Sequence, residues 1–243
     1  MVDFTLTDEQ KDLQELAHSF AEKEIRPVAW EYDKDGTWPE DIIKKAFEVG
    51  LMNTHIPEEY GGPGLDFLTG CLIEEELGWG CSGIGTTLMC NGLATAPVLL
   101  GGSEKIKKQY LSMLCEEPKL ASFCLTEPDA GSDVSGMRTT AVKKGDKYVI
   151  NGTKCFITNG GYADWYTVYA KTDPDAGHKG ISAFVVPREA GVVVDKKEDK
   201  LGQRASNTAT ISFNDVEVPA DHLLGEENKG FKLAMMTLDR TRP

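Results

Sequence analysis

Two short segments of the chain carry residue types that could hold an electron-rich, planar ligand. The first is FCLTEPDAGS, Phe123–Ser132, in which Thr126 and Ser132 each bring a hydroxyl that donates and accepts hydrogen bonds. Pro128 fixes the end of a short strand, and Gly131 lets the backbone approach a ligand closely. Such a loop offers N–H and O–H donors to an acceptor edge, which a reduced flavin or a phosphate provides. The same residues also fit an ordinary turn-rich entry into a sheet.

The second segment is KCFITNG, Lys154–Gly160. The Asn-Gly pair at 151–152 is typical of a type I′ hairpin, so we expect the second segment to run back beside residues 148–150. Phe156 then gives a flat apolar face, with the Thr158 hydroxyl two residues on and on the same strand face. An aromatic ring and a hydroxyl in this relation suit the face and edge of a flavin. A phenylalanine packed in a core is the alternative.

The residues that precede the first segment show helical periodicity. Thr7 and Gln10 form a capping-box pattern, and apolar residues recur at helical spacing after it. The stretches predicted as helices are 7–27, 39–50, 67–77, 84–100 and 104–115. Residues 1–118 are therefore expected to form an all-α domain of five or six helices.

Beyond Pro118 the apolar period changes to two. Strands are expected in AVKKGDKYVINGTKCFIT, WYTVYAKT, GISAFVVP, GVVVDK and TATISFNDVEVP. Residues 119–228 should then form an antiparallel β-barrel domain, and helical character returns over 229–243. The predicted fold class is α+β multidomain, an all-α N-terminal domain followed by an antiparallel β-barrel.

Two motifs within the helical region resemble a catalytic carboxylate cluster and a dinucleotide-binding loop, but the structure expected around each does not suit that function. Glu74–Glu76 places three carboxylates in different directions around a helix, which favours a solvated or ion-paired face over acid–base catalysis. Gly78, Gly80 and Gly83 spell GxGxxG, but they follow a helix and not a strand. We interpret these glycines as helix-packing residues.

Composition narrows the function classes. The net charge of −13 argues against a general nucleic-acid or anionic-membrane surface. Six scattered cysteines form no CxxC pair and four histidines show no ligand spacing, so we expect reduced, mostly buried thiols and no metal site. No apolar run suggests a membrane span, and no signal peptide is recognised. The expected location is cytoplasmic, or the mitochondrial matrix if a transit peptide has been removed.

Five motifs together resemble the acyl-CoA dehydrogenase family, most closely its medium-chain members. They are GLMNTHIPEEYGGPG, TEPDAGSD, NGTKCFITNG, LGQRASNT before FNDVEVP, and LDRTRP, and they follow one another from end to end of the chain. The resemblance implies a helical N-terminal domain, a middle β-barrel, a C-terminal four-helix bundle, and FAD as cofactor. Members convert an acyl-CoA to the trans-2-enoyl-CoA in fatty acid β-oxidation. They pass electrons to an electron-transferring flavoprotein and form homotetramers.

The resemblance also implies roles for particular residues. The cofactor-binding residues are Phe123, Cys124, Leu125, Thr126, Gly131, Ser132, Phe156, Ile157 and Thr158. Thr158 would reach flavin N5, and Ser132 would lie near the FAD pyrophosphate and the substrate. Asp239 and Arg242 are the other implied substrate-binding residues, and Met89 stands where a medium-chain member has a glutamate at the base of its acyl pocket.

No glutamate in this sequence matches the catalytic base of the medium-chain type, which the resemblance places beyond Pro243. We therefore expect an acyl-CoA dehydrogenase polypeptide without its C-terminal bundle, as a homo-oligomer or as a complementing subunit, and weakly active or inactive alone. The alternatives are an acyl-CoA oxidase, with O₂ as acceptor, and a non-catalytic flavin or acyl-CoA binding subunit of a split enzyme.

Overall fold

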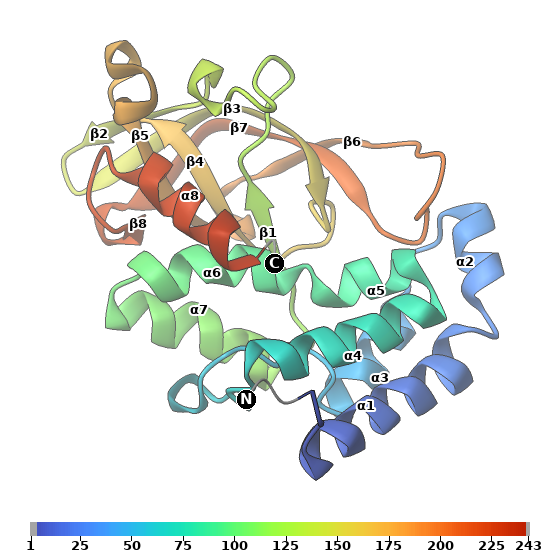
Figure 1. The fold of residues 1–243 in the computed structure, drawn as a ribbon. Helices are drawn as coiled ribbons and strands as arrows, with labels where there is room; N and C mark the ends of the chain where they lie inside the picture. The colour runs from blue at the N-terminus through green and yellow to red at the C-terminus, as the bar shows by residue number, and fades with distance from the viewer. Residues whose placement is uncertain (1–3, 242–243) are drawn as a thin grey trace. The chain divides into compact units, whose positions relative to one another are not determined.

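The computed structural model describes residues 4–241, which fold as two compact units (Figure 1). Unit 1 comprises the residues up to Met89 together with Asp199–Ser206, and unit 2 comprises Cys90–Glu198 with the residues from Asn207 on. The polypeptide therefore passes from one unit to the other three times. The division at 118 and 228 expected from the sequence stays a prediction.

Unit 1 is helical. Its helices are α1 (Asp8–Phe20), which continues as a π-helical turn over Ala21–Ile25, α2 (Ala29–Asp35), α3 (Glu40–Glu48), α4 (Phe67–Gly80) and α5 (Ser82–Met89). The capping box is confirmed, because the Thr7 hydroxyl accepts from the Gln10 amide and the Gln10 side chain accepts from the Thr7 amide. Glu76 of α4 accepts from Gln14 Nε2 at 3.0 Å and lies 2.7 Å from His18 Nδ1. The last residue of the glutamate run is thus hydrogen-bonded to side chains of the neighbouring helix α1.

Close packing accounts for two glycines of the GxGxxG pattern. A Cβ on Gly80 would lie 2.9 Å from the Cβ of Ala21, and one on Gly83 would lie 3.2 Å from the backbone of Gln203. The Gly80 contact confirms helix packing for that glycine, whereas Gly83 packs on the non-helical segment around Gln203, and the motif runs along α4 into α5 with no described strand before it. Segment Asp199–Ser206 belongs to unit 1 and is hydrogen-bonded to its helical part through Arg204, whose amide donates to Asp33 Oδ1 at 2.7 Å.

Unit 2 is built on an eight-stranded sheet (Figure 1). Its strands are β1 (Ala121–Cys124), β2 (Thr140–Lys144), β3 (Lys147–Thr158), β4 (Trp165–Lys171), β5 (Ile181–Pro187), β6 (Val193–Lys197), β7 (Thr208–Pro219) and β8 (Leu223–Leu224). Their order is β6-β7-β3-β2-β4-β5-β8, with β1 paired to β4. The expected order, helices followed by a mainly antiparallel sheet, is confirmed, but the barrel is not closed. In the described strands, β6 and β8 each pair on one side only, and β4 pairs in parallel with β1 and β2.

The Asn151–Gly152 pair is not a turn. Strand β3 continues through it while pairing with β7, with a register shift between Ile150 and Gly152, and the β2–β3 hairpin turns at Gly145-Asp146, as expected. Gly152 has φ 148°, and a Cβ there would lie 2.4 Å from Thr139 Oγ1. Glycine is required at this position because Thr139 approaches the backbone closely, and not because the chain reverses there. The segment around Phe156 consequently continues the same strand, and the expected return beside residues 148–150 is wrong.

The described α-helices of unit 2 are α6 (Asn91–Gly101), α7 (Glu104–Glu116) and α8 (Gly230–Thr241). Figure 1 shows α6 and α8 running close together beside the sheet. The N-terminus of α8 lies directly on β5, since a Cβ on Gly230 would lie 2.5 Å from the backbone of Ser182. Tyr110 of α7 meets the buried Trp165 of β4 edge-on at 5.5 Å between ring centroids.

One apolar helical stretch of the described residues, Ser82–Gly101, is long enough to cross a membrane by length and composition. The sequence expectation that no apolar run reaches this length is therefore corrected. Two-thirds of its most apolar window is buried inside the fold, which is also the pattern of a core helix. The single helix expected over 84–100 divides at Cys90 into α5 and α6.

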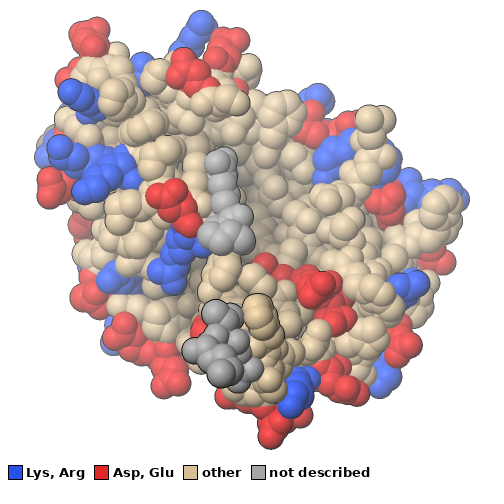
Figure 2. Space-filling model, in the orientation of Figure 1, with Lys and Arg blue, Asp and Glu red and all other residues tan. Residues whose placement is uncertain are grey.

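The cysteines are all free thiols, as expected, but only Cys124 and Cys155 are fully buried. The other four are half-buried and none is exposed, so burial is less complete than expected. Among the described residues, no group of histidine, cysteine and acidic side chains could hold a metal ion. Figure 2 shows acidic and basic side chains interspersed on one face of the molecule.

Candidate functional site

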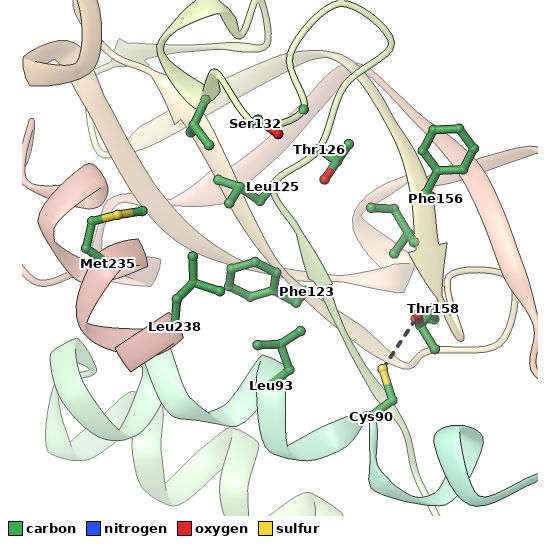
Figure 3. A pocket seen from close by; sticks show the side chains of 13 residues that line it. Cys90, Leu93, Phe123, Leu125, Thr126, Ser132, Phe156, Thr158, Met235 and Leu238 are labelled. Atoms are coloured by element: carbon green, nitrogen blue, oxygen red, sulfur yellow. Dashed lines mark hydrogen bonds between the residues drawn. The ribbon is translucent and has the colours of Figure 1, made fainter. Parts of the chain in front are cut away.

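A cavity of about 510 Å³ lies within unit 2 (Figure 3). Its volume falls in the range of about 300–1,000 Å³ that small-molecule sites occupy. Its lining comprises Cys90, Leu93, Phe123, Leu125, Thr126, Gly131, Ser132, Val134, Phe156, Ile157, Thr158, Met235 and Leu238. Apart from the Cys90 thiol, none of these described residues carries an ionisable side chain. The cavity is therefore apolar with a few hydroxyls.

The structure brings both sequence segments to this one cavity. Of the nine residues expected to bind a cofactor, all except Cys124 line it. Cys124 is fully buried within the sheet core. Of the expected substrate residues, Ser132 lines the cavity, Asp239 is exposed on α8 and does not line it, and Arg242 lies outside the described residues.

The first wall is the loop that follows β1. The amide of Glu127 donates to the Ala130 carbonyl at 3.0 Å, and the Ala130 amide donates back at 3.2 Å, which closes a tight turn. The Thr126 carbonyl accepts from the amide of Cys155 at 3.0 Å. This bond joins the loop to β3 just where β3 carries the second segment, and it explains why segments far apart in sequence share one cavity.

The second wall is a bulge in β3. The β3–β7 register shifts between Lys154 and Ile157, so two residues of β3 oppose one of β7. Phe156, inside the bulge, has φ 58°, and its side chain is 65% exposed. A bulky residue in the left-handed region is strained, and an exposed phenylalanine beside a cavity leaves a flat apolar face for a ligand. Figure 3 shows Phe156 at one side of the cavity and Thr126 between it and Leu125.

Thr158 is held through its backbone and leaves its side chain unused. Its carbonyl accepts from Ser122 Oγ at 2.7 Å and from Cys90 Sγ at 3.6 Å (Figure 3). Within residues 4–241, the hydroxyls of Thr126, Ser132 and Thr158 make no side-chain hydrogen bond to the protein. Three polar groups at one apolar cavity are thus available to a ligand.

Five lining residues were not anticipated from the sequence, namely Cys90, Leu93, Val134, Met235 and Leu238. Val134 belongs to the loop that follows β1, whereas the other four come from the helical side of unit 2, and Figure 3 shows Leu93, Met235 and Leu238 close to Phe123. Met235 and Leu238 are three residues apart, which places them on one face of α8 and is the signal that could have identified them. Burial raises the pKa of Cys90 to about 12, so this thiol is protonated and unreactive at neutral pH.

The donor set fits the ring of the flavin that the sequence resemblance implies. Phe123 and Phe156 offer aromatic surface, and Thr126, Ser132 and Thr158 offer donors for the polar edge of the ring. The lining lacks the charged groups that a polyanionic ligand would need within the cavity itself. An uncharged, planar heteroaromatic group is the better match.

The comparisons with known proteins agree with this geometry. Residues 7–118 match the family "Acyl-CoA dehydrogenase, N-terminal domain", and residues 122–216 match "Acyl-CoA dehydrogenase, middle domain". The chain is 46% identical over 245 residues to a probable medium-chain specific acyl-CoA dehydrogenase of Caenorhabditis briggsae, with 99% of this chain and 60% of that protein covered.

Solved structures give the same result. The chain matches butyryl-CoA dehydrogenase from Megasphaera elsdenii with a TM-score of 0.93 and 44% identity, covering 98% of this chain and 64% of that one. It also matches a chain of a structure titled for the electron transferring flavoprotein of Acidaminococcus fermentans. That match has a TM-score of 0.94 and 46% identity, covering 98% of this chain and 63% of the other.

The chain spans 60 to 64% of the length of these three relatives. The two family matches cover most of it, one after the other, and the second contains most of the residues that line the cavity. The chain belongs to the acyl-CoA dehydrogenase family, whose members are FAD-dependent oxidoreductases of fatty acid oxidation.

Proposed function

We propose that the cavity of unit 2 holds the flavin ring of FAD for an acyl-CoA dehydrogenase reaction. The observation that carries this proposal is the convergence of three unpartnered hydroxyls and two aromatic rings on one cavity. FAD, when bound, accepts the hydride that leaves the substrate. The residues of this chain bind, orient and shield it.

Each wall has a separate task. The loop with Thr126 and Ser132 would donate hydrogen bonds to the polar edge of the ring, and the exposed Ser132 would be the residue nearer the phosphates and the substrate. Phe156 would cover one face of the ring, and Thr158 would donate to its N5 edge. Leu93, Met235 and Leu238 close the apolar side and exclude water, which strengthens each hydrogen bond formed inside.

The proposed reaction is the α,β-dehydrogenation of a fatty acyl-CoA thioester to the trans-2-enoyl-CoA. Electrons then pass to an electron-transferring flavoprotein, and the protein acts as an oligomer, as is typical of the family. The match to a butyryl-CoA dehydrogenase supports a thioester substrate, and the match to a chain from an electron-transferring flavoprotein structure supports that partner. The acyl chain length is left open.

The described lining contains no carboxylate that could remove the substrate α-proton. Because that proton is removed by a positioned base, we expect the polypeptide 1–243 by itself to bind FAD and to turn over acyl-CoA weakly or not at all. Asp239 is an exposed residue of α8, and we propose it contacts the CoA moiety and does not act as the base.

FAD binding is the direct test. The purified chain, freed of flavin, is titrated with FAD and followed by flavin fluorescence, with Thr158→Val as the variant. Thr153→Val on the same strand is the control, because its hydroxyl pairs with Ser212 at 3.2 Å and does not line the cavity. We expect saturable binding, weakened about fivefold in Thr158→Val by loss of one hydrogen bond. A folded chain that takes up no FAD contradicts the proposal.

Activity assays separate the possible reactions. Acyl-CoA thioesters of different chain lengths are added to the FAD-loaded chain, and both dye reduction and peroxide release are measured. Little or no turnover is expected, because the described cavity lining contains no carboxylate that could act as the catalytic base. Steady dye reduction would show that this expectation is wrong, and peroxide release with dye reduction absent would favour an acyl-CoA oxidase.

A further inference from the structure

A lysine and a glutamate form a fully buried ion pair behind the cavity. Lys154 Nζ lies 2.7 Å from Glu127 Oε1, and their side chains are 0% and 5% exposed. Every other ion pair of the described chain has at least one partner that is well exposed. Burying two charges costs several kcal/mol per ion before their attraction is counted. Such a pair adds little to stability compared with apolar packing, so its placement calls for another explanation.

The contacts of Glu127 join both ends of the first cavity wall. One carboxylate oxygen accepts from the Arg138 amide at 2.6 Å, and the other accepts from the Thr139 amide at 3.1 Å and from Lys154. Glu127 itself begins the turn that closes on Ala130. A single side chain thus fastens the end of the loop at residues 138–139 to its start at residue 127.

The contacts of Lys154 join that loop to the second wall. Besides the carboxylate of Glu127, its ammonium group donates to the Leu125 carbonyl at 3.1 Å. Lys154 precedes the bulge of β3, and the next residue, Cys155, donates its amide to Thr126. Phe156 follows at once. The ion pair therefore lies where the two walls meet, and neither Lys154 nor Glu127 lines the cavity.

The carboxylate is kept ionised by its surroundings. Burial acts to raise the pKa of Glu127, but the Lys154 charge and the hydrogen bonds from the Arg138 and Thr139 amides outweigh it, so the pKa lies below its ordinary value. An ionised carboxylate accepts stronger hydrogen bonds than a neutral group, which tightens all three connections.

We propose that the buried Lys154–Glu127 pair is a positioning device that fixes the loop 126–139 against β3 and so sets the spacing of the two walls that hold the flavin. The proposal rests on the function proposed above, because it concerns the same site. Lys154 and Glu127 touch no ligand in this arrangement. They act through Thr126 and Ser132 on one wall and Phe156 and Thr158 on the other.

The test uses three variants of the chain: Glu127→Gln, Lys154→Met and the double variant. The first readout is trypsin cleavage of the Arg138–Thr139 bond, followed by mass spectrometry. Arg138 is exposed, and the Thr139 amide must leave Glu127 before cleavage. We expect cleavage at this bond to be at least tenfold faster in each single variant. Cleavage after the exposed Lys143 serves as the internal reference.

The second and third readouts are the FAD dissociation constant and the melting temperature of the flavin-free chain. Each single variant should melt lower, because one buried charge has lost its partner, and should bind FAD about tenfold more weakly. The double variant should recover most of the melting temperature, because no unpaired charge remains. Its fast cleavage and weak FAD binding should persist, because the loop is no longer drawn to β3.

The control removes an exposed ion pair between β3 and β7. Lys147 and Glu217 form an exposed pair at 2.5 Å, so Lys147→Met with Glu217→Gln should change none of the three readouts. Recovery of slow cleavage and FAD affinity together with the melting temperature in the double Lys154/Glu127 variant would overturn the proposal, because the pair would then be only structural. If the parent chain takes up no FAD, the proposed function fails, and the cleavage arm still decides whether the pair holds the loop.

Discussion

At the scale of single residues, Phe156 shows a conflict between backbone preference and site geometry. A non-glycine residue at φ 58° costs about 1–2 kcal/mol, and the exposed ring regains little of that by packing. The bulge nevertheless holds the ring at the cavity. Local strain of this kind is commonly tolerated where a ligand uses the resulting geometry.

The Phe156→Gly variant should separate stability from binding. Glycine relieves the strain but gains entropy in the unfolded state, so we expect the free energy of unfolding of the flavin-free chain to rise by about 0.5–1 kcal/mol. FAD binding should weaken about fivefold with the loss of the aromatic face. Urea unfolding and FAD titration measure the two effects. Gln203→Gly, at φ 51° and outside the cavity lining, is the control and should change stability alone.

At the scale of elements, β3 decides the arrangement of unit 2. It pairs with β2 in a hairpin, pairs with β7 along most of its length, and carries the residues of the second cavity wall. Its continuity through residues 151–152 is possible because Gly152 leaves room for Thr139, the same residue whose amide is bound by Glu127. The Asn151 side chain meanwhile bonds to Asp215 across the register shift, with Nδ2 to Oδ1 at 3.0 Å.

We expect Gly152→Ala to be strongly destabilising, by about 3 kcal/mol or more. An added Cβ would lie 2.4 Å from Thr139 Oγ1 and 2.7 Å from Thr139 Cα, so backbone must move. Gly145→Ala is the matched control, since it also has positive φ but no atom within 4 Å of the new Cβ, and should cost about 1 kcal/mol. Equal melting temperatures for the two variants would contradict the close-approach explanation.

A second prediction at this scale concerns acid stability near β8. His222 is buried, its Nδ1 lies 3.1 Å from the Val185 carbonyl, and its ring meets Tyr110 edge-on at 5.6 Å. Burial lowers the pKa of His222, against the smaller raising effect of the Val185 carbonyl. Since the unfolded chain takes up this proton near pH 6.5 and the folded chain does so only at lower pH, stability is full above pH 6.5. It falls as the pH drops through the folded pKa.

The variant His222→Asn keeps a donor for Val185 and removes the titration. Its free energy of unfolding should therefore fall less than that of the parent chain between pH 7.5 and pH 5.5, by up to about 1.4 kcal/mol per pH unit within the titration window. Urea unfolding at several pH values measures this. The neighbouring Asp221 has a pKa lowered by its hydrogen bond to Lys105, so it stays ionised over this range. Parallel pH profiles for the two proteins would contradict the assignment to His222.

Much of the helical part was predictable because its signals are local. The capping box at Thr7 and the turn at Gly145 depend on neighbours in sequence, and the structure confirms both. The glycine at 152 was misread because its reason is a contact with Thr139, thirteen residues away along the chain. The helical side of the cavity was missed for the same reason. Leu93 and Met235 are ordinary apolar helix residues until the fold brings them to Phe123.

At the scale of the whole molecule, the net charge should affect the stability of the folded state. The chain carries −13, while all but one of its described ion pairs are at least partly exposed. Self-repulsion of the excess acidic groups destabilises the folded state, and salt screens it over about 10 Å at 0.1 M. Exposed ion pairs contribute little to stability, so the same screening removes little stabilisation from them.

We therefore expect the melting temperature to rise by a few degrees between 10 mM and 300 mM NaCl at pH 7.5, as measured by calorimetry. The same scan at pH 5, close to the isoelectric point near 4.8, should show a much smaller effect of salt. A fall in melting temperature with salt at pH 7.5 would show that attractive ion pairs outweigh repulsion.

The assignment of Asp199–Ser206 to unit 1 has a consequence for how the molecule is made. A ribosome delivers residues 1–89 first, but the segment that packs on Gly83 and binds Asp33 is synthesised more than a hundred residues later. Unit 1 cannot complete its contacts until most of the sheet has emerged. In a nascent chain stalled near residue 150, the helices of unit 1 should accordingly be susceptible to protease. In a chain stalled far enough beyond residue 206 for that residue to have left the ribosomal tunnel, the same helices should be protected.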